Sequence, residues 1–163
     1  MKLKRLVLFC LAIVLLCACR AQGGGDNHLL GLGMGSIGVL DHTKVLFGSL
    51  EYRPNIQFYK FKPWFSLEAG HHLFYLSTGV LIDFRLSRRL LFTPGFGAGV
   101  YTDDREIDLG HMLEFQSSAE ISYRFDNAAR LALCYGHISN AGIDTNNPGT
   151  EMLKISYFVP FGK

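Results

Sequence analysis

The sequence predicts an all-β protein, an eight-stranded antiparallel transmembrane β-barrel. After an N-terminal leader, no apolar run is long enough for a membrane-spanning helix, although 48% of all residues are hydrophobic and only 18% are charged. The chain does contain eight strand-like stretches, several of which alternate between apolar and polar residues. Their lengths approach what a tilted strand needs to cross a bilayer, and eight is the smallest common strand number of such barrels. These observations favour a small outer-membrane barrel.

The leader, residues 1–21, has the three-part layout of a bacterial export signal. It consists of a positive region, a short apolar core and small residues: Lys2, Lys4 and Arg5; Leu6 to Leu16; and Cys17, Ala18 and Cys19. Two cleavage sites fit this layout. One follows Ala21, and the other precedes Cys19, which would then become a lipidated N-terminus. We expect one folded domain over residues 22–163, because no linker or repeat divides it.

Removal of the leader changes the charge and the cysteine content. The whole chain has 16 basic and 14 acidic residues, and the leader takes away four basic residues and no acidic ones, so the remainder has a net charge of −2. No basic patch is left for a nucleic acid, and we expect none as a partner. Beyond Cys19, the chain retains only Cys134. A disulfide framework is therefore excluded, and Cys134 is expected to be a small packing residue.

The eight expected strands follow one another without a helix between them. Their ranges are 28–39, 43–53, 62–71, 73–86, 88–100, 111–125, 129–139 and 150–161. The start of the third is obscured by Pro54 and Pro63. The sixth alternates most clearly, with Leu113, Phe115, Ala119, Ile121, Tyr123 and Phe125 on one face and Glu114, Gln116, Ser118, Glu120, Ser122 and Arg124 on the other. In a membrane barrel, the apolar face meets lipid and the polar face lines the lumen.

A soluble β-sandwich shows the same alternation, so periodicity alone does not separate the two folds. The aromatic residues favour the barrel, because six of them lie near strand ends, where an interfacial girdle is expected. They are Tyr52, Trp64, Phe84, Tyr101, Phe125 and Phe158. A periplasmic sandwich anchored through a lipidated Cys19 remains the alternative fold.

The lengths of the connections orient the barrel. The turns around Ser87 and Asp126 are short, whereas the connections at 101–110 and 140–149 are longer. Outer-membrane barrels have short turns in the periplasm and longer loops outside the cell. We therefore expect the loop 140–149, and with it the end of the seventh strand, at the cell surface.

Three residues able to perform acyl-transfer chemistry meet at this end of the predicted barrel. The seventh stretch carries Leu131, Leu133, Tyr135, His137 and Ser139 on one face, which its apolar members predict to be the lipid face. Residues two apart on a strand lie about 7 Å apart, so the His137 imidazole can reach the Ser139 hydroxyl with suitable rotamers. Glu151 begins the paired eighth stretch on its apolar face. An alcohol, an imidazole and a carboxylate are thus expected together on the outer wall.

Each residue type has a role in such chemistry. A serine hydroxyl becomes a useful nucleophile when a neutral imidazole takes its proton, and a carboxylate on the other ring nitrogen orients that imidazole. Backbone amides and asparagine side chains can stabilise the oxyanion. The candidates are Asn140, Asn147, Ala141 and Gly142. A His-x-Ser pair alone is usually structural, but polar groups on a lipid-facing stripe are costly without a purpose. This chemistry requires no cofactor, and the other histidines show no spacing that indicates a metal site.

The stretch from Tyr135 to Glu151 resembles the signature of the lipid A 3-O-deacylase (PagL) family. That signature is His-x-Ser-Asn-Ala, a loop with Asn and Gly, and a Glu fourteen residues after the His, as Glu151 follows His137. The resemblance implies Ser139 as the nucleophile, His137 as the base, Glu151 as its partner and Asn147 at the oxyanion. The family usually has Pro-Asn before the loop glycine, whereas Asn147 and Pro148 are inverted here, so the choice of asparagine stays open.

The same resemblance implies a bacterial outer-membrane serine esterase that acts on lipid A or lipopolysaccharide. A homodimer is left open. Two alternatives of different class remain: a non-catalytic barrel with a structural or adhesive role, and a barrel acyltransferase that passes the acyl chain to another lipid.

Overall fold

The computed structural model describes residues 22–23, 27–103 and 107–162. The predicted export signal, with Cys19, lies outside these residues. Within them, no helix has the length and apolar character needed to cross a membrane.

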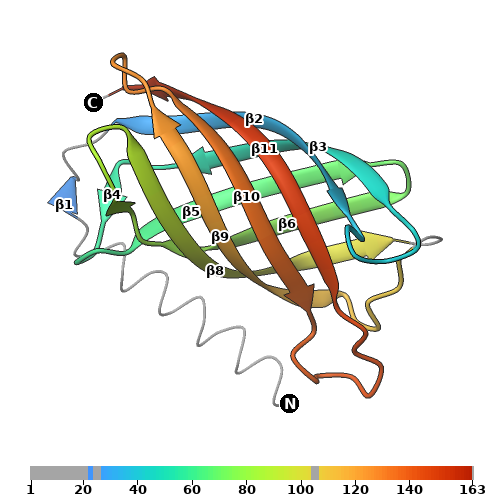
Figure 1. The fold of residues 1–163 in the computed structure, drawn as a ribbon. Helices are drawn as coiled ribbons and strands as arrows, with labels where there is room; N and C mark the ends of the chain where they lie inside the picture. Colours follow the sequence, from blue (N-terminus) through green and yellow to red (C-terminus); the bar gives the residue numbers. More distant parts are fainter. Residues whose placement is uncertain (1–21, 24–26, 104–106, 163) are drawn as a thin grey trace.

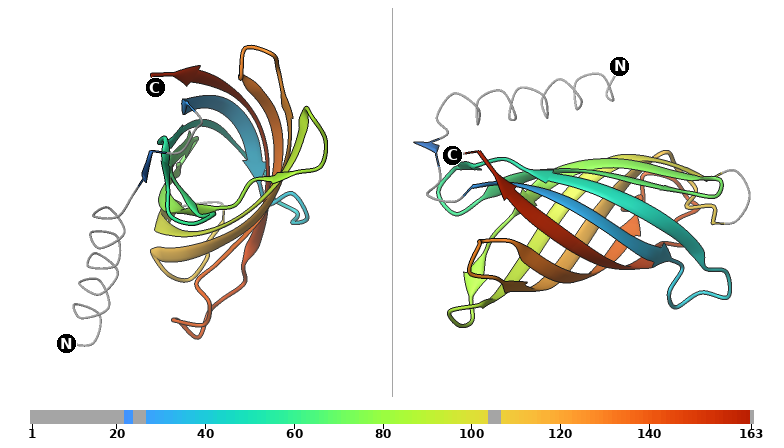
Figure 2. Two further views of the ribbon diagram at one scale, coloured as in Figure 1. Left: turned by 90° about the vertical axis from the view of Figure 1, so that its left-hand side faces the viewer. Right: turned by 90° about the horizontal axis from the view of Figure 1, so that it is seen from above.

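Eight long antiparallel strands close into a barrel (Figure 1). They are β2 (His28–Ile37), β3 (Val45–Arg53), β5 (Lys62–Gly70), β6 (Leu73–Leu81), β8 (Leu90–Asp103), β9 (Leu113–Arg124), β10 (Arg130–Ser139) and β11 (Thr150–Phe161). Each pairs with the next along the chain, β6 pairs with β8, and β11 pairs with β2 to close the cylinder. Three short strands complete the structure: β1 (Gln22–Gly23) pairs with β4 (Ile56–Gln57), and β7 (Phe84–Arg85) pairs with β8. The predicted fold class is confirmed, and the views in Figure 2 show the tilted strands around the barrel axis.

The barrel has two distinct ends. One end carries the connections 38–44, 71–72 and 140–149, and we name it the surface end because the loop 140–149 is predicted at the cell surface. At the other end, which we name the termini end, β2 begins at His28 and β11 ends at Phe161. Connection length separates the ends less cleanly than expected, because the two-residue connection 71–72 lies at the surface end.

The predicted fourth strand, 73–86, is too long. The chain leaves the β6 ladder after Leu81, and Phe84 pairs instead with Phe92 in a hairpin between β7 and β8. The break lies at Asp83, whose carboxylate accepts hydrogen bonds from Lys62 and Arg130, each at 3.0 Å. These contacts hold the Asp83 side chain across the termini end of the barrel, and Asp83 does not continue the pairing of β6 with β8.

Side chains alternate between the lumen and the outer wall, as β10 shows. Its even-numbered residues are buried, whereas Leu131, Leu133 and Tyr135 are 42%, 53% and 44% exposed. Large apolar side chains are exposed in the same way around the cylinder, from Leu32 on β2 to Val159 on β11. An apolar outer surface of this extent suits lipid and not water, so the soluble sandwich is wrong.

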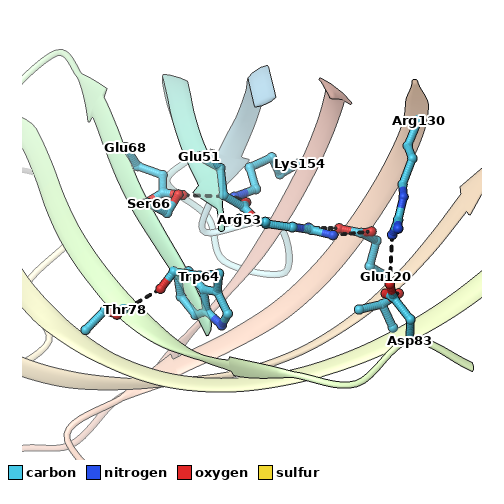
Figure 3. Close-up of polar contacts among 11 residues, drawn as sticks. Glu51, Arg53, Trp64, Ser66, Glu68, Thr78, Asp83, Glu120, Arg130 and Lys154 are labelled. Atoms are coloured by element: carbon cyan, nitrogen blue, oxygen red, sulfur yellow. Dashed lines mark hydrogen bonds and ion pairs between the residues drawn. The ribbon is translucent and has the colours of Figure 1, made fainter. Parts of the chain in front are cut away.

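A charged network fills the middle of the lumen (Figure 3). Arg53 Nε donates to Glu51 Oε1 at 2.7 Å, and Arg53 Nη1 donates to Glu120 Oε1 at 3.1 Å. Lys154 Nζ donates to Glu51 Oε2 at 2.9 Å and to Glu68 Oε1 at 3.0 Å. Buried charges require such partners, because water is not there to solvate them.

An apolar plug closes the lumen at the surface end. Its members are Ile37, Val45, Phe47, Leu73, Tyr75, Tyr101, Ile107, Leu109, Ile138 and Met152. The interior of a barrel of this size is filled by side chains and does not form a channel. Ile138 and Met152 of the plug are fully buried and are the sequence neighbours of the outward residues His137 and Glu151. The plug therefore fixes the backbone of β10 and β11 at these two residues.

Three of the six predicted girdle aromatics point into the lumen instead. Trp64, Tyr101 and Phe158 are buried, because their positions share the lumen-facing parity of their strands. Glycines provide the space: a Cβ on Gly31 would lie 2.4 Å from the Phe158 ring, and one on Gly97 would lie 2.6 Å from Trp64. The aromatics that do face outward at the termini end form clusters. They are Tyr52, Phe65 and Phe161; Tyr123, Phe125 and Tyr157; and Phe84 and Phe92.

Candidate active site

The register of β10 and β11 places His137 directly opposite Glu151 on the outer wall. His137 Nδ1 lies 3.2 Å from Glu151 Oε1, and the two side chains are 47% and 22% exposed. A carboxylate accepts hydrogen bonds and does not donate them, so Nδ1 carries the hydrogen in this contact. The Nε2 lone pair of His137 is then available to accept a proton, which is what a general base requires.

Gly149 borders the other edge of the imidazole, a contact that the sequence analysis missed. A Cβ at Gly149 would lie 2.9 Å from Cε1 and 3.2 Å from Nε2 of His137, and the residue has a φ of +65°. Any larger residue would therefore strain the backbone and push the ring. No sequence pattern indicates this contact, because it depends on the register of the hairpin, whose continuation places Gly149 opposite Ser139.

Ser139 lies on the same outward face of β10, two residues after His137. It is partly exposed and stands opposite Phe115 of β9. No hydrogen bond joins its hydroxyl to the imidazole in the part of the chain that the structure describes. Such contacts are often loose before substrate binds and tighten in the complex.

A second hydroxyl lies beside the imidazole. Ser117 of β9 is exposed on the outer wall and is the register partner of His137 on the side away from Glu151. Directly opposite residues have Cβ atoms about 4.5–5.5 Å apart. Sequence periodicity cannot reveal this neighbour, because the pairing depends on the register of β9 against β10.

Asn140 organises the loop 140–149. It is fully buried, and its side-chain amide donates to the carbonyls of Leu109 at 2.9 Å and Asn146 at 2.8 Å. Its Oδ1 accepts the Gly142 N–H at 2.9 Å. The side-chain donors of Asn140 and the N–H of Gly142, both oxyanion candidates, are thus engaged within the protein.

Two of the candidate oxyanion donors remain, the side-chain amide of Asn147 and the backbone N–H of Ala141. Asn147 Oδ1 accepts the Asn140 N–H at 3.1 Å, which turns its Nδ2 away from that contact. Among the described residues, neither Asn147 Nδ2 nor the Ala141 N–H has a hydrogen-bond partner. Ala141 has a φ of +54°, so the backbone is in the left-handed region at this turn.

Other contacts fix the loop and the start of β11. The Glu151 carbonyl accepts the N–H of Gly38 at 2.9 Å, and the Thr150 hydroxyl donates to Asp41 at 2.8 Å. In the loop itself, hydrogen bonds from the Asn146 N–H and the Thr145 hydroxyl hold the pKa of Asp144 below its usual value. Asp144 is therefore charged near neutral pH and accepts these bonds fully.

Within residues 22–23, 27–103 and 107–162, no three His, Cys, Asp or Glu residues are grouped so that they could hold a metal ion. The described arrangement offers an imidazole with a carboxylate on one nitrogen, hydroxyls nearby and free amide donors. These are the groups that acyl transfer uses.

Comparison with known proteins adds to this geometry. Residues 47–160 match the model of the family described as lipid A 3-O-deacylase (PagL), a range that contains the whole candidate site. A curated protein named lipid A deacylase PagL, from Bordetella bronchiseptica, is 26% identical over 92 residues, or 55% of this chain and 52% of that protein. The match thus spans about half the length of this relative.

Two solved structures share the fold. The outer membrane enzyme PagL superposes with a TM-score of 0.60 at 17% identity, over 82% of this chain and 99% of that one. Neisserial surface protein A superposes with a TM-score of 0.65 at 11% identity, over 86% of this chain and 99% of that one. At these identities, the likeness concerns the barrel and not the chemistry.

Proposed function

The chain belongs to the lipid A 3-O-deacylase (PagL) family of outer-membrane β-barrels, and from this premise we propose that it is a serine esterase that removes the 3-O-linked acyl chain of lipid A. The observation that carries the proposal is the 3.2 Å contact between His137 Nδ1 and Glu151 Oε1 on the outer wall. A carboxylate–imidazole pair has little structural reason to face lipid, because the same face of β10 continues with the exposed residues Tyr135, Leu133 and Leu131.

The proposed reaction has two steps. Ser139 Oγ attacks the acyl carbonyl while His137 Nε2 takes the hydroxyl proton, and Glu151 stabilises the imidazolium that forms. The tetrahedral intermediate collapses to an acyl-enzyme, and His137 returns the proton to the departing 3-hydroxyl of the sugar. Water then attacks the acyl-enzyme with His137 again as the base, the bond between the acyl carbon and Ser139 Oγ breaks as His137 returns the proton to that oxygen, and the free fatty acid leaves.

For the oxyanion, we propose the donors Asn147 Nδ2 and the Ala141 N–H. The donors of Asn140 and Gly142 are engaged within the loop, which favours the two that are free. Asn140 would then act as a positioning residue, because its N–H orients the Asn147 amide. Removing one oxyanion donor typically costs about 100- to 1000-fold in kcat.

The position of the site on the wall suits a membrane lipid. The outward side chains that precede His137 on β10 are Tyr135 and Leu133, both exposed, and the Tyr135 ring and the Leu133 side chain can lie along an acyl chain. The ester of such a lipid lies where the chain meets the headgroup, and His137 stands at the corresponding end of the strand.

The test is to incubate purified protein with lipid A in ¹⁸O-labelled water and to identify the products by mass spectrometry. The expected result is lipid A that lacks one acyl chain and a free fatty acid that carries one ¹⁸O in its carboxyl group. An acyl chain transferred to a second lipid without label would indicate the acyltransferase. Unchanged lipid A under conditions where the barrel is folded would indicate the non-catalytic barrel.

Replacing Gly149 by Ala should lower kcat/KM by about a hundredfold, because the new methyl group displaces the His137 ring. Deacylation rates of the purified variant measure the effect. Gly142→Ala is the matched control: Gly142 has a φ of +75°, so it carries similar backbone strain, but a Cβ there meets nothing within 4 Å. Equal losses in the two variants would mean that strain, and not contact with the imidazole, accounts for the effect.

A further inference from the structure

A pocket with a volume of about 340 Å³ opens at the termini end, far from the candidate active site. Among the described residues, its lining contains five basic side chains and one acidic side chain: Lys60, Lys62, Arg85, Arg124 and Arg130, with Asp83. None of these residues takes part in the proposed reaction.

Asp83, the carboxylate in the described lining of this pocket, accepts three hydrogen bonds from neighbouring side chains. Asp83 Oδ2 accepts from Lys62 and Arg130, and its Oδ1 accepts the Thr93 hydroxyl at 2.8 Å. Burial alone would raise the pKa of Asp83, but Arg130, Lys62 and the Thr93 hydrogen bond hold it well below its usual value. Asp83 therefore supplies a single negative charge, and both of its oxygens already accept hydrogen bonds from Lys62, Arg130 and Thr93.

A buried arginine, Arg130, also lines this pocket. Its side chain is only 4% exposed, it extends along the lumen wall to Asp83 (Figure 3), and its Nε has no hydrogen-bond partner within the described part of the chain. A buried donor without a partner is costly, and more so on a charged group. Among the described residues, the side chains of Lys60, Arg85 and Arg124 also make no hydrogen bond or ion pair. The pocket thus combines excess positive charge with donors that lack an acceptor.

We propose that this pocket binds a phosphate group, either in the headgroup of a phospholipid or as inorganic phosphate. Guanidinium groups present paired N–H donors that match phosphate oxygens, and the pocket offers three of them. Phe84 also lines the pocket, and the neighbouring Leu86 and Leu90 are exposed. A bound headgroup could therefore keep its acyl chains on the lipid-facing wall.

The test uses the full-length protein purified in a phosphate-free detergent. The variant Arg85→Gln/Arg124→Gln removes two pocket cations, and Lys44→Gln/Arg88→Gln removes two exposed cations outside the pocket. Thermal unfolding is followed against inorganic phosphate, with chloride at equal ionic strength. Native mass spectrometry then counts retained phosphatidylglycerol against phosphatidylcholine.

We expect phosphate or phosphatidylglycerol to bind the wild type and the control, and to bind the pocket variant at least about tenfold more weakly. Stabilisation by inorganic phosphate without lipid retention identifies the free ion as the ligand, and selective retention of phosphatidylglycerol identifies the headgroup. Equal binding by the pocket variant and the control, or no binding by the wild type, would overturn the proposal.

Discussion

Ser139→Ala should abolish the release of fatty acid from lipid A, with a fall in kcat of at least about a thousandfold. Without the hydroxyl, the His137 base has no nucleophile to activate, and only binding and oxyanion stabilisation remain. The folded barrel should be unchanged, because the Ser139 hydroxyl makes no hydrogen bond among the described residues and the backbone pairing of Ser139 with Phe115 is kept. Mass spectrometry of lipid A and of the free fatty acid measures the loss, and heat-dependent migration on a gel confirms folding.

Ser117→Ala is the matched control for this variant. Ser117 is the other hydroxyl beside His137, and it lies on the same outer wall in an adjacent strand. We expect its removal to change kcat only slightly. If Ser117→Ala is inactive and Ser139→Ala keeps its activity, the assignment of the nucleophile is wrong.

Arg53→Met should destabilise the barrel by about 3–5 kcal/mol. The change removes the shared partner of Glu51 and Glu120: Glu51 keeps its contact with Lys154, but Glu120 is left with an uncompensated charge in the lumen. It also removes the guanidinium that lies 4.1 Å from the centroid of the Phe158 ring. Denaturant unfolding in lipid vesicles measures the effect, and the fluorescence of Trp64, the one tryptophan of the chain, reports directly from the lumen.

Arg89→Met provides the comparison, because it also breaks an arginine–carboxylate pair. Arg89 contacts Asp126 at 2.9 Å, but the two side chains are 50% and 85% exposed. Surface pairs of this kind contribute about 0–1 kcal/mol. If both variants lose the same free energy of unfolding, the lumen network does not have the role assigned to it.

Most of the fold could be predicted from the sequence. A strand whose outward residues are all apolar shows the two-residue alternation that identifies it as a strand. The outward apolar faces of β10 and β11 are of this kind, and the predicted ends of both strands agree with the structure to within one residue. The break at Asp83 could not be predicted, because it depends on Lys62 and Arg130, which are distant in sequence. The lumen aromatics were misjudged for a related reason. A residue such as Phe158 fits inside only because Gly31 stands beside it on another strand.

The candidate site divides in the same way. His137 and Glu151 could be paired from the alternation of two strands and one turn. The contact of Gly149 with the imidazole and the position of Ser117 required the actual register. The role of Asn140 depends on the segment that carries Leu109, which packs over the loop from another connection. Local sequence patterns contain no information about such a neighbour.

The apolar plug has a consequence for how this protein meets a lipid. Because Ile37, Tyr75 and Met152 are fully buried beneath the outer wall, the described side chains fill the barrel axis at the level of the candidate site. Encounter with a membrane lipid must therefore be sideways, by two-dimensional diffusion within one leaflet. The rate of encounter then depends on the mole fraction of the substrate lipid in the membrane. Dilution with inert lipid should therefore slow turnover even when the bulk concentration of the substrate lipid is constant.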